Sequence, residues 1–285
     1  MPLNYEALSN WEFEDVTQTL TERDTMLYAL GLGFGDNPTD EKELAYVYED
    51  GLMAVPSMAV TLGYPGFWLR DPRTGIDWKK VLHGEQWLDV YKPLPVKGEL
   101  IGRTRIDQIS DKGEERGAVI YLSRDIIDAA SGKTLAKVSM STFCRGDGGF
   151  GGENKPGPTP ASIPEREPDH VCDLATLPRQ ALIYRLSGDY NPLHADPKIA
   201  RAAGFERPIL HGLATYGLAA RAILKTLCDY DARRLTGLDV RFSAPVYPGE
   251  TVRFHIWREG DGARFRASVA ERQVVVLNNG AARFT

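Results

Sequence analysis

Apolar and polar residues are arranged along the chain in two successive series of the same kind. The first series begins with a capping-box-like pattern at Thr21–Asp24, which predicts a helix running to about Leu32. An apolar segment follows at Val55–Tyr64, and it is long enough for a buried helix. Strand-like runs, with clear apolar–polar alternation in the second, then predict strands at Ala118–Asp125 and Thr134–Phe143.

The second series repeats this order after the middle of the chain. Pro178 and Gly188 bracket one predicted helix, and Asp196-Pro197 begins another that closes at Gly204. The apolar segment Ile209–Leu224 predicts a long buried helix. Strands with alternating apolar residues follow, and Asn279-Gly280 predicts a hairpin turn near the end.

Two series of helices followed by antiparallel strands predict a duplicated α+β unit, in which each sheet wraps around its apolar helix. Joined edge to edge, two such sheets would remove two exposed strand edges. The Gly- and Pro-rich stretch Gly146–Asp169 separates the two series and favours a linker. We therefore expect a first repeat at 1–150, a linker at 151–169 and a second repeat at 170–285; one large α+β domain is the alternative.

Composition and charge narrow the classes of protein. The 285 residues are 42% hydrophobic and 26% charged, as in ordinary folded proteins. A formal net charge of −5 argues against a dedicated binder of nucleic acids or anionic membranes. Three cysteines without CxxC spacing indicate a reducing compartment. Without a signal-peptide or membrane-spanning pattern, we expect a cytoplasmic location.

The segment from Tyr184 to His211 holds the strongest candidate chemistry. Asp189, Asn191 and His194 lie in a loop between predicted helices, where a carboxylate and an imidazole can converge on one water molecule. Taken singly, Asp189 also fits the cap of a turn, and His194 also fits a histidine in the core. A metal site is disfavoured, because these two residues and Asp196 lack a convincing third ligand.

Gly212 follows His211 at the start of the long apolar helix. The first N–H groups of a helix lack internal partners, and a glycine lets a ligand oxygen approach closely, as a thioester enolate requires. Close packing of this glycine against a neighbouring element is the alternative interpretation. The GxGxxG match at Gly146–Gly151 runs into prolines rather than a helix, so it does not predict a dinucleotide site.

Several ordered motifs together resemble the enoyl-CoA hydratase 2 family, also called MaoC-like or R-specific hydratases. This family includes the hydratase part of peroxisomal multifunctional enzymes of type 2. The resemblance covers nearly the whole chain. The segments that carry it are Tyr46–Asp50, Val81–Gln86, Lys92–Glu99, Gly148–Gly152, Tyr184–His194, Ile209–Thr215 and Arg241–Thr251.

The resemblance implies a double hot-dog fold and the reversible hydration of trans-2-enoyl-CoA to (3R)-3-hydroxyacyl-CoA, a hydro-lyase reaction without a metal or redox cofactor. It implies catalytic roles for Asp189, Asn191 and His194, with the Gly212 N–H in the oxyanion hole. It also implies a supporting role for Glu49. The residues implied to contact the CoA ester are His83, Gly84, Lys112, Tyr190, Pro192, Leu193, His211 and Phe242.

In this interpretation the second repeat carries the chemistry. The first repeat has Ser57-Met58 where the second has His211-Gly212, so it resembles a degenerate copy that accommodates the acyl chain. The partner implied is a small-molecule acyl-CoA, with a homodimer as a further possibility. Two alternatives stay open, an acyl-CoA thioesterase and a non-catalytic acyl-CoA-binding hot-dog protein. Acyl-chain length and branching are not predicted.

Overall fold

The computed structural model describes residues 3–285, and its strands form one antiparallel sheet. The ten strands follow the order β1-β3-β4-β5-β2-β7-β10-β9-β8-β6. In the first half they are β1 (Val16–Leu20), β2 (Val81–Val90), β3 (Gly98–Asp111), β4 (Ala118–Asp128) and β5 (Thr134–Cys144). In the second half they are β6 (His170–Ala175), β7 (Leu235–Phe242), β8 (Thr251–Glu259), β9 (Gly262–Val269) and β10 (Val274–Phe284).

The helices lie mostly before each group of strands. The α-helices are α1 (Tyr5–Ser9), α2 (Glu22–Leu30), α3 (Glu41–Leu44), α4 (Gln180–Tyr184), α5 (Pro197–Ala202) and α6 (Gly212–Leu227). Short 3₁₀ helices are η1 (Pro56–Thr61), η2 (Trp68–Arg70), η3 (Pro72–Thr74), η4 (Trp78–Lys80), η5 (Arg185–Ser187), η6 (Pro192–His194) and η7 (Ala232–Arg234). No helix among residues 3–285 combines the length and apolar character that a membrane crossing needs.

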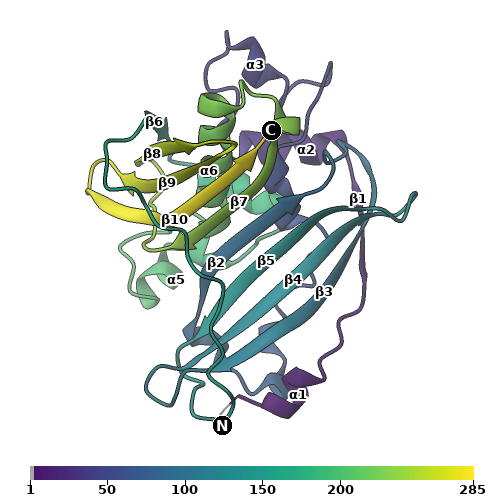
Figure 1. Cartoon of the computed structure of the whole chain (residues 1–285), viewed down its shortest axis with the longest axis vertical. Helices are drawn as coiled ribbons and strands as arrows, with labels where there is room; N and C mark the ends of the chain where they lie inside the picture. Colours follow the sequence, from purple (N-terminus) through teal and green to yellow (C-terminus); the bar gives the residue numbers. More distant parts are fainter. Residues whose placement is uncertain (1–2) are drawn as a thin grey trace.

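The two halves meet edge to edge at β2 and β7, as expected from the repeated pattern (Figure 1). Their register runs from the Glu85–Arg241 pair to the Asp89–Gly237 pair. The strand order reads the same outward from this seam on both sides, because β1, β3, β4 and β5 correspond to β6, β8, β9 and β10. The seam therefore turns two five-stranded sheets into one continuous sheet.

Helix α6 is the central helix of the second half and lies against its sheet (Figure 1). Residues Ala214–Leu224 are all buried, as the apolar pattern predicts. Gly217 is needed for this packing, since a Cβ atom there would lie 2.4 Å from Cδ2 of Leu32. The helix therefore packs directly against the first half.

A buried ion pair joins α6 to the first half. Arg221 in α6 and Glu43 in α3 are 4% and 2% exposed, and their closest atoms, Nη2 and Oε1, are 2.9 Å apart. The Tyr230 hydroxyl donates to the same carboxylate at 2.9 Å, and Arg221 Nη1 donates to Leu32 O at 3.1 Å. Because both charges are compensated, this cluster holds α3 against α6 without leaving an isolated buried ion.

The first half departs from the prediction at its own apolar segment. The expected helix at Val55–Tyr64 is only the short 3₁₀ helix η1. The backbone turns at Gly63, where φ is +56° and where an added Cβ would lie 2.5 Å from Gly102 Cα. The sheet passes too close at that point for a longer helix, so α6 has no counterpart of equal length in the first half.

The predicted hairpin turn at Asn279-Gly280 is also wrong. Both residues lie inside β10, where the register with β7 and β9 shifts in a β-bulge. Asn279 adopts φ 52° there, so the turn-favouring residues create a bulge within a strand that is paired on both sides. The actual turn between β9 and β10 lies at residues 270–273.

Residues 151–169 contain neither helix nor strand. In Figure 1 this segment crosses the sheet from the first half to β6. Its backbone is held at several points, including bonds from Ser110 Oγ to Lys155 O at 2.8 Å and from Asn279 Nδ2 to Ala161 O at 2.8 Å. The segment is therefore an ordered connection along the sheet.

Candidate active site

A loop between α4 and α5 presents the predicted acid–base residues. Asn191 caps the short helix η6, because its side chain accepts a hydrogen bond from Leu193 N at 3.1 Å. Asp189 Oδ1 accepts from Asn191 N at 3.1 Å, which fixes the preceding turn. At the end of η6, His194 is buried and only 8% exposed, whereas Asp189 is exposed. The local polar contacts thus orient both side chains.

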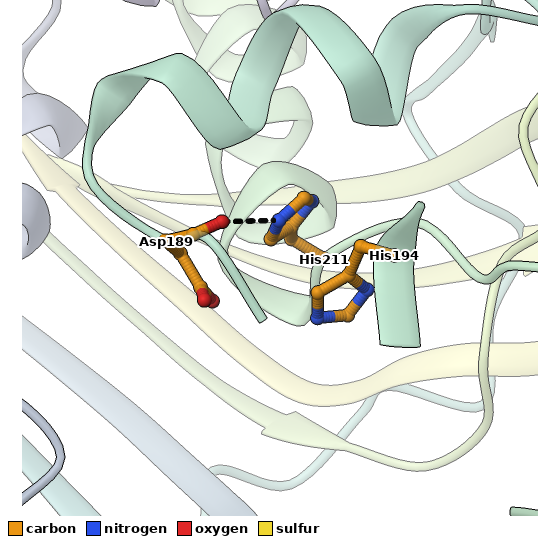
Figure 2. Close-up of side chains that lie close together, drawn as sticks. All are labelled: Asp189, His194 and His211. Atoms are coloured by element: carbon orange, nitrogen blue, oxygen red, sulfur yellow. Dashed lines mark hydrogen bonds between the residues drawn. The ribbon is translucent and has the colours of Figure 1, made fainter. Parts of the chain in front are cut away.

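Asp189 and His194 come together with His211, the residue that precedes α6. One carboxylate oxygen of Asp189 and one ring nitrogen of each histidine lie within 4.8 Å of one another. Figure 2 shows the Asp189 carboxylate and the His194 ring turned toward one space. An oxygen at about 2.8 Å from each of two acceptors spans such a separation. The arrangement therefore fits one water molecule held between Asp189 and His194.

Backbone carbonyls determine the proton positions on both imidazoles. His194 Nδ1 lies 2.9 Å from Ile209 O, and His211 Nε2 lies 3.1 Å from Asp189 O. Because a carbonyl oxygen only accepts, these two nitrogens carry the protons. A neutral His194 therefore keeps an unprotonated Nε2 that can accept a proton. The two rings stack with centroids 3.7 Å apart.

Burial keeps both imidazoles neutral. It lowers the pKa of His194 below its usual value, although the nearby Asp189 charge acts in the opposite direction. The pKa of His211 is lowered for the same reason and also by the stacked His194. Protonating one ring would place a buried cation against the other. His194 is therefore suited to act as a base at neutral pH.

The sequence interpretation lacked a third candidate metal ligand beside Asp189 and His194. In the structure this third residue is His211, not Asp196. Asp196 instead caps α5 by accepting from Lys198 N at 2.7 Å. His211 already donates from Nε2 to Asp189 O, and its Nδ1 is buried without a partner among residues 3–285. Binding a metal through Nε2 would break the contact that holds the Asp189 loop. A metal ion in this cluster would have to use His211 Nδ1, and a site without a metal stays a prediction.

Gly212 begins α6 beside this cluster and is exposed. Ala214 N and Thr215 N both donate to His211 O, and no side chain among the described residues caps the helix. The N–H at the positive end of the helix is therefore available to an anionic oxygen. Phe242 lies alongside, since a Cβ added to Gly212 would be 3.4 Å from its Cε1.

The first half contributes His83 to the same region. Its ring lies edge-on to Phe242 with centroids 4.7 Å apart, and His83 Nε2 lies 3.1 Å from Glu85 O. Burial lowers the pKa of His83 to about 4. The β2–β5 register shifts between His83 and Glu85, and Gly84 lies in this bulge. The bulge therefore lies at the position where the His83 ring packs against Phe242 of the second half.

The remaining predicted contact residues differ in accessibility. Tyr190 is 58% exposed and carries the Arg185 guanidinium 4.9 Å above its ring. Pro192 is exposed and Leu193 is partly buried, so this loop can contact a ligand. His211 is only 1% exposed and touches the catalytic candidates instead. The expected substrate contact by His211 therefore does not fit its position.

Two predicted residues are not joined to the cluster by any contact among residues 3–285. The Lys112 ammonium donates to Asn154 Oδ1 at 2.8 Å and to Lys155 O at 3.0 Å, so it is engaged by the linker. Glu49 is exposed in the loop after α3. The buried glutamate of that region is Glu43, which holds Arg221.

The sequence interpretation did not predict the residues that pack on the buried side of the cluster of Asp189, His194 and His211. Tyr184 is 1% exposed, packs against His211 with ring centroids 5.0 Å apart, and has a buried hydroxyl without a partner among the described residues. Its ring also contacts Tyr28, whose hydroxyl donates to Ser57 Oγ at 3.0 Å. An apolar helix pattern does not distinguish such tyrosines from ordinary core residues.

Comparison with known proteins supports one assignment across the chain. Residues 18–146 match the MFE-2 hydratase 2 N-terminal domain, and residues 160–279 match the MaoC like domain. The chain is 38% identical to peroxisomal enoyl-CoA hydratase 2 of Arabidopsis thaliana, over 96% of this chain and 93% of that protein. A crystal structure of a MaoC-like dehydratase from Phytophthora capsici superposes with a TM-score of 0.87 at 36% identity, covering 99% of both chains.

A more distant structure supports the fold alone. A Mycobacterium tuberculosis protein described as having a double hotdog fold superposes with a TM-score of 0.56 at 15% identity, over 97% of each chain. Its fold agrees with the two half-sheets joined at β2 and β7. Together, the domain matches, the whole-chain similarity and the architecture show that this protein belongs to the MaoC-like enoyl-CoA hydratase 2 family and has the double hot-dog fold.

Proposed function

We propose that the protein catalyses the reversible, R-specific hydration of trans-2-enoyl-CoA. The observation that carries this proposal is the convergence of the Asp189 carboxylate and the His194 imidazole within 4.8 Å, beside the uncapped start of α6. A carboxylate and a neutral imidazole at this separation can hold and deprotonate one water molecule. Membership of the enoyl-CoA hydratase 2 family supports the choice of an enoyl thioester as substrate.

The water is activated by both groups at once. In the proposed step, Asp189 accepts one hydrogen bond from the water and His194 Nε2 takes its other proton. The water oxygen forms a bond to C3, and the double-bond electrons move through C2 to the thioester oxygen. The resulting enolate takes the proton from His194 at C2, on the same face. This returns the imidazole to its neutral form, and one water has been added overall.

The oxyanion is stabilised at the start of α6. Negative charge that develops on the thioester oxygen is met by the Gly212 N–H, which carries the positive end of the helix dipole. One such donor typically contributes a factor of about 10²–10³ in kcat. The exposed position of Gly212 beside the Phe242 ring supports this role, because a flat thioester can lie against the ring.

His211 acts as a positioning residue in this proposal, and Asn191 has the same kind of role. His211 donates to Asp189 O and stacks on His194, so it holds both groups from the buried side. Asn191 caps η6 and so orients His194. Removing either residue should misplace the water rather than remove an acid or base.

The rest of the substrate would extend on both sides of the reacting carbons. We assign CoA contacts to His83, Gly84, Tyr190 and Phe242, with Pro192 and Leu193 on the loop edge. A CoA contact by Lys112 requires its release from Asn154 and Lys155. The short η1 in place of a long helix supports an acyl-accommodating role for the first repeat. A homodimer, a cytoplasmic location and a role for Glu49 stay predictions.

Two substitutions test the assignment. Asp189→Asn and His194→Gln should each lower kcat for trans-2-enoyl-CoA by about 10²–10⁴, because each removes a proton-transfer partner. Folding should be retained, since neither change alters side-chain volume much. Asp196→Asn is the matched control, because its side chain still caps α5 and it should keep wild-type turnover.

The product identifies the reaction. Hydration removes the conjugated enoyl absorbance without releasing thiol, and chiral analysis should give the (3R) alcohol. Release of free CoA would instead indicate a thioesterase, and tight binding without turnover would indicate a binding protein. An (S) product, or near-normal turnover by either variant, would refute the proposal.

A further inference from the structure

A cavity of about 410 Å³ lies between the two repeats, and we call it the Met53 cavity. Its walls come from the segment before η1, from the end of β2 with the loop that follows, and from η7 with the start of β7. The lining residues are Leu52, Met53, Ala54, Pro56, Val90, Tyr91, Lys92, Pro93, Leu94, Val96, Ala232, Arg233 and Thr236. Pockets that hold small molecules typically measure about 300–1,000 Å³, so the cavity is large enough for a ligand.

The Met53 cavity and the candidate active site lie at opposite ends of the β2–β7 seam. The active-site end has His83 near the start of β2 and Phe242 at the end of β7. The cavity has Val90 at the end of β2 and Thr236 near the start of β7. Val90 is seven residues beyond His83, which corresponds to roughly 23 Å along a strand. The cavity is therefore a separate place on the molecule.

The internal symmetry of the sheet relates these two ends. β2 and β7 are antiparallel, and the Trp87–Asp239 pair is the middle of their register. Exchanging the two strands about this pair brings Val90 onto Phe242 and Thr236 onto Gly84. Phe242 and Gly84 are the positions at which the second repeat would meet the thioester. The Met53 cavity is therefore the counterpart, in the first repeat, of the proposed thioester site.

The start of η1 completes this correspondence but has lost the catalytic groups. Ser57-Met58 stand where the second repeat has His211-Gly212. Met58 N donates to Val55 O at 2.9 Å, so this N–H is already used within the backbone. Ser57 Oγ accepts a hydrogen bond from the Tyr28 hydroxyl at 3.0 Å. The lining of the cavity includes no histidine and no carboxylate among the described residues, so it is suited to binding without hydration.

The lining combines mostly apolar walls with positive charge at the edge. Lys92 is exposed and has no ion pair within residues 3–285, whereas the neighbouring Lys97 is paired with Glu22 at 3.0 Å. The second cation, Arg233, is paired with Asp231 at 2.8 Å. An apolar cavity beside an unpaired cation favours a ligand that has an apolar chain and an anionic group. An acyl thioester of CoA has both, because its acyl chain is apolar and its phosphates are anionic.

We propose that the Met53 cavity is a second, non-catalytic binding site for an acyl-CoA thioester. The choice of this ligand rests on the proposed hydratase function, since the cavity is the counterpart of the place at which the second repeat would hold its substrate. The acyl chain packs between Met53, Leu94 and Val96, and a phosphate of CoA meets Lys92. One chain therefore binds two thioesters and hydrates only the one beside Asp189.

Calorimetry with decanoyl-CoA, which has no double bond to hydrate, tests this site by counting the bound molecules. Wild-type protein should bind two thioesters per chain. Thr236→Phe should fill the cavity and reduce this number to one, while kcat for trans-2-enoyl-CoA is retained. Lys92→Glu should weaken one of the two binding events about 10-fold, because it reverses the charge beside the phosphate. Lys79→Glu is the matched control, since this exposed lysine precedes β2 at the opposite end of the strand and should leave both events unchanged.

The outcomes separate this inference from the proposed reaction. Two thioesters per chain, reduced to one by Thr236→Phe, would support the inference even without hydration, and the absence of hydration would then refute the hydratase function alone. One thioester per wild-type chain with normal hydration would overturn the inference and leave the hydratase function intact. If Thr236→Phe fails to fold, the Lys92→Glu comparison decides.

Two other occupants of the cavity are distinguished in the same experiments. Free decanoate is titrated in parallel, and Lys92-dependent binding of decanoate but not of decanoyl-CoA would overturn the assignment to a thioester. A single bound thioester, together with a loss of kcat/KM in Thr236→Phe for long acyl chains only, would show that the cavity is the end of one acyl tunnel. That result would also overturn the inference.

Discussion

Replacing Gly212 with proline would remove the proposed oxyanion donor with little change to the fold. Gly212 is the first residue of α6, a position where proline is favoured because its N–H is not used inside the helix. The preceding residue, His211, already has φ −58° and ψ 137°, which is the extended conformation that proline requires before it. A Cβ at this position would lie 3.4 Å from Phe242, an ordinary contact.

The expected loss can be stated from this geometry. Removing one oxyanion donor costs about 10²–10³ in kcat, equivalent to about 2.7–4 kcal/mol of transition-state stabilisation. The free energy of unfolding should change little, or rise by up to about 1 kcal/mol through the restricted unfolded chain. The assay combines steady-state hydration of a trans-2-enoyl-CoA with thermal unfolding of the same preparations.

Gly217→Ala is the matched control in the same helix. Its added methyl group would collide with Leu32 at 2.4 Å, so stability should fall while turnover per folded molecule is retained. Gly212→Pro should therefore lose turnover and keep its stability, whereas Gly217→Ala should lose stability and keep its turnover. Turnover by a folded Gly212→Pro variant within a few-fold of wild type would refute the role of this N–H.

Two further predictions concern charge. Arg221→Met should destabilise the protein by about 3–5 kcal/mol in urea unfolding, because Glu43 is left buried without its partner. Adding Glu43→Gln should restore much of this loss. Equal stability of the single and double variants would contradict this prediction. Because burial lowers the pKa of His194, its base form persists below the usual value of about 6.5, and the acid limb of kcat/KM against pH should lie below that value. Activity that falls with an apparent pKa above 6.5 would contradict it.

Local patterns predicted the elements whose stability is decided locally. The Thr21–Asp24 capping box forms as expected, with Thr21 N donating to Asp24 Oδ2 at 3.0 Å and Asp24 N to Thr21 Oγ1 at 3.2 Å. Helix α6 is buried as its apolar pattern required. The loop motif around Asp189 and His194 was also predictable, because Asn191 caps its own turn through residues two positions away.

Elements whose conformation depends on neighbouring strands could not be predicted from the sequence. The segment Val55–Tyr64 is apolar enough for a helix, yet Gly63 meets Gly102 of β3, and only the folded sheet imposes that limit. Likewise, Asn279-Gly280 has the residues of a hairpin turn, but β10 is paired on both sides and absorbs them as a bulge. In both cases long-range packing overrides a local preference.

The candidate site shows the same division. His211 was expected to touch the substrate, but stacking on His194 gives it a different position. Lys112 is expected to contact the CoA ester, but its ammonium is held by Asn154, and a contact so remote in sequence cannot be predicted from a lysine alone.

The seam between β2 and β7 has a consequence for how the chain can be divided. If the connection at residues 151–169 were cut, the fragments would still share backbone pairing at the seam and the Arg221–Glu43 contact. Each fragment produced alone would instead present β2 or β7 as an unpaired edge, which promotes aggregation. We therefore expect the two repeats to assemble as complementing fragments, and we expect neither repeat alone to serve as a module in another protein.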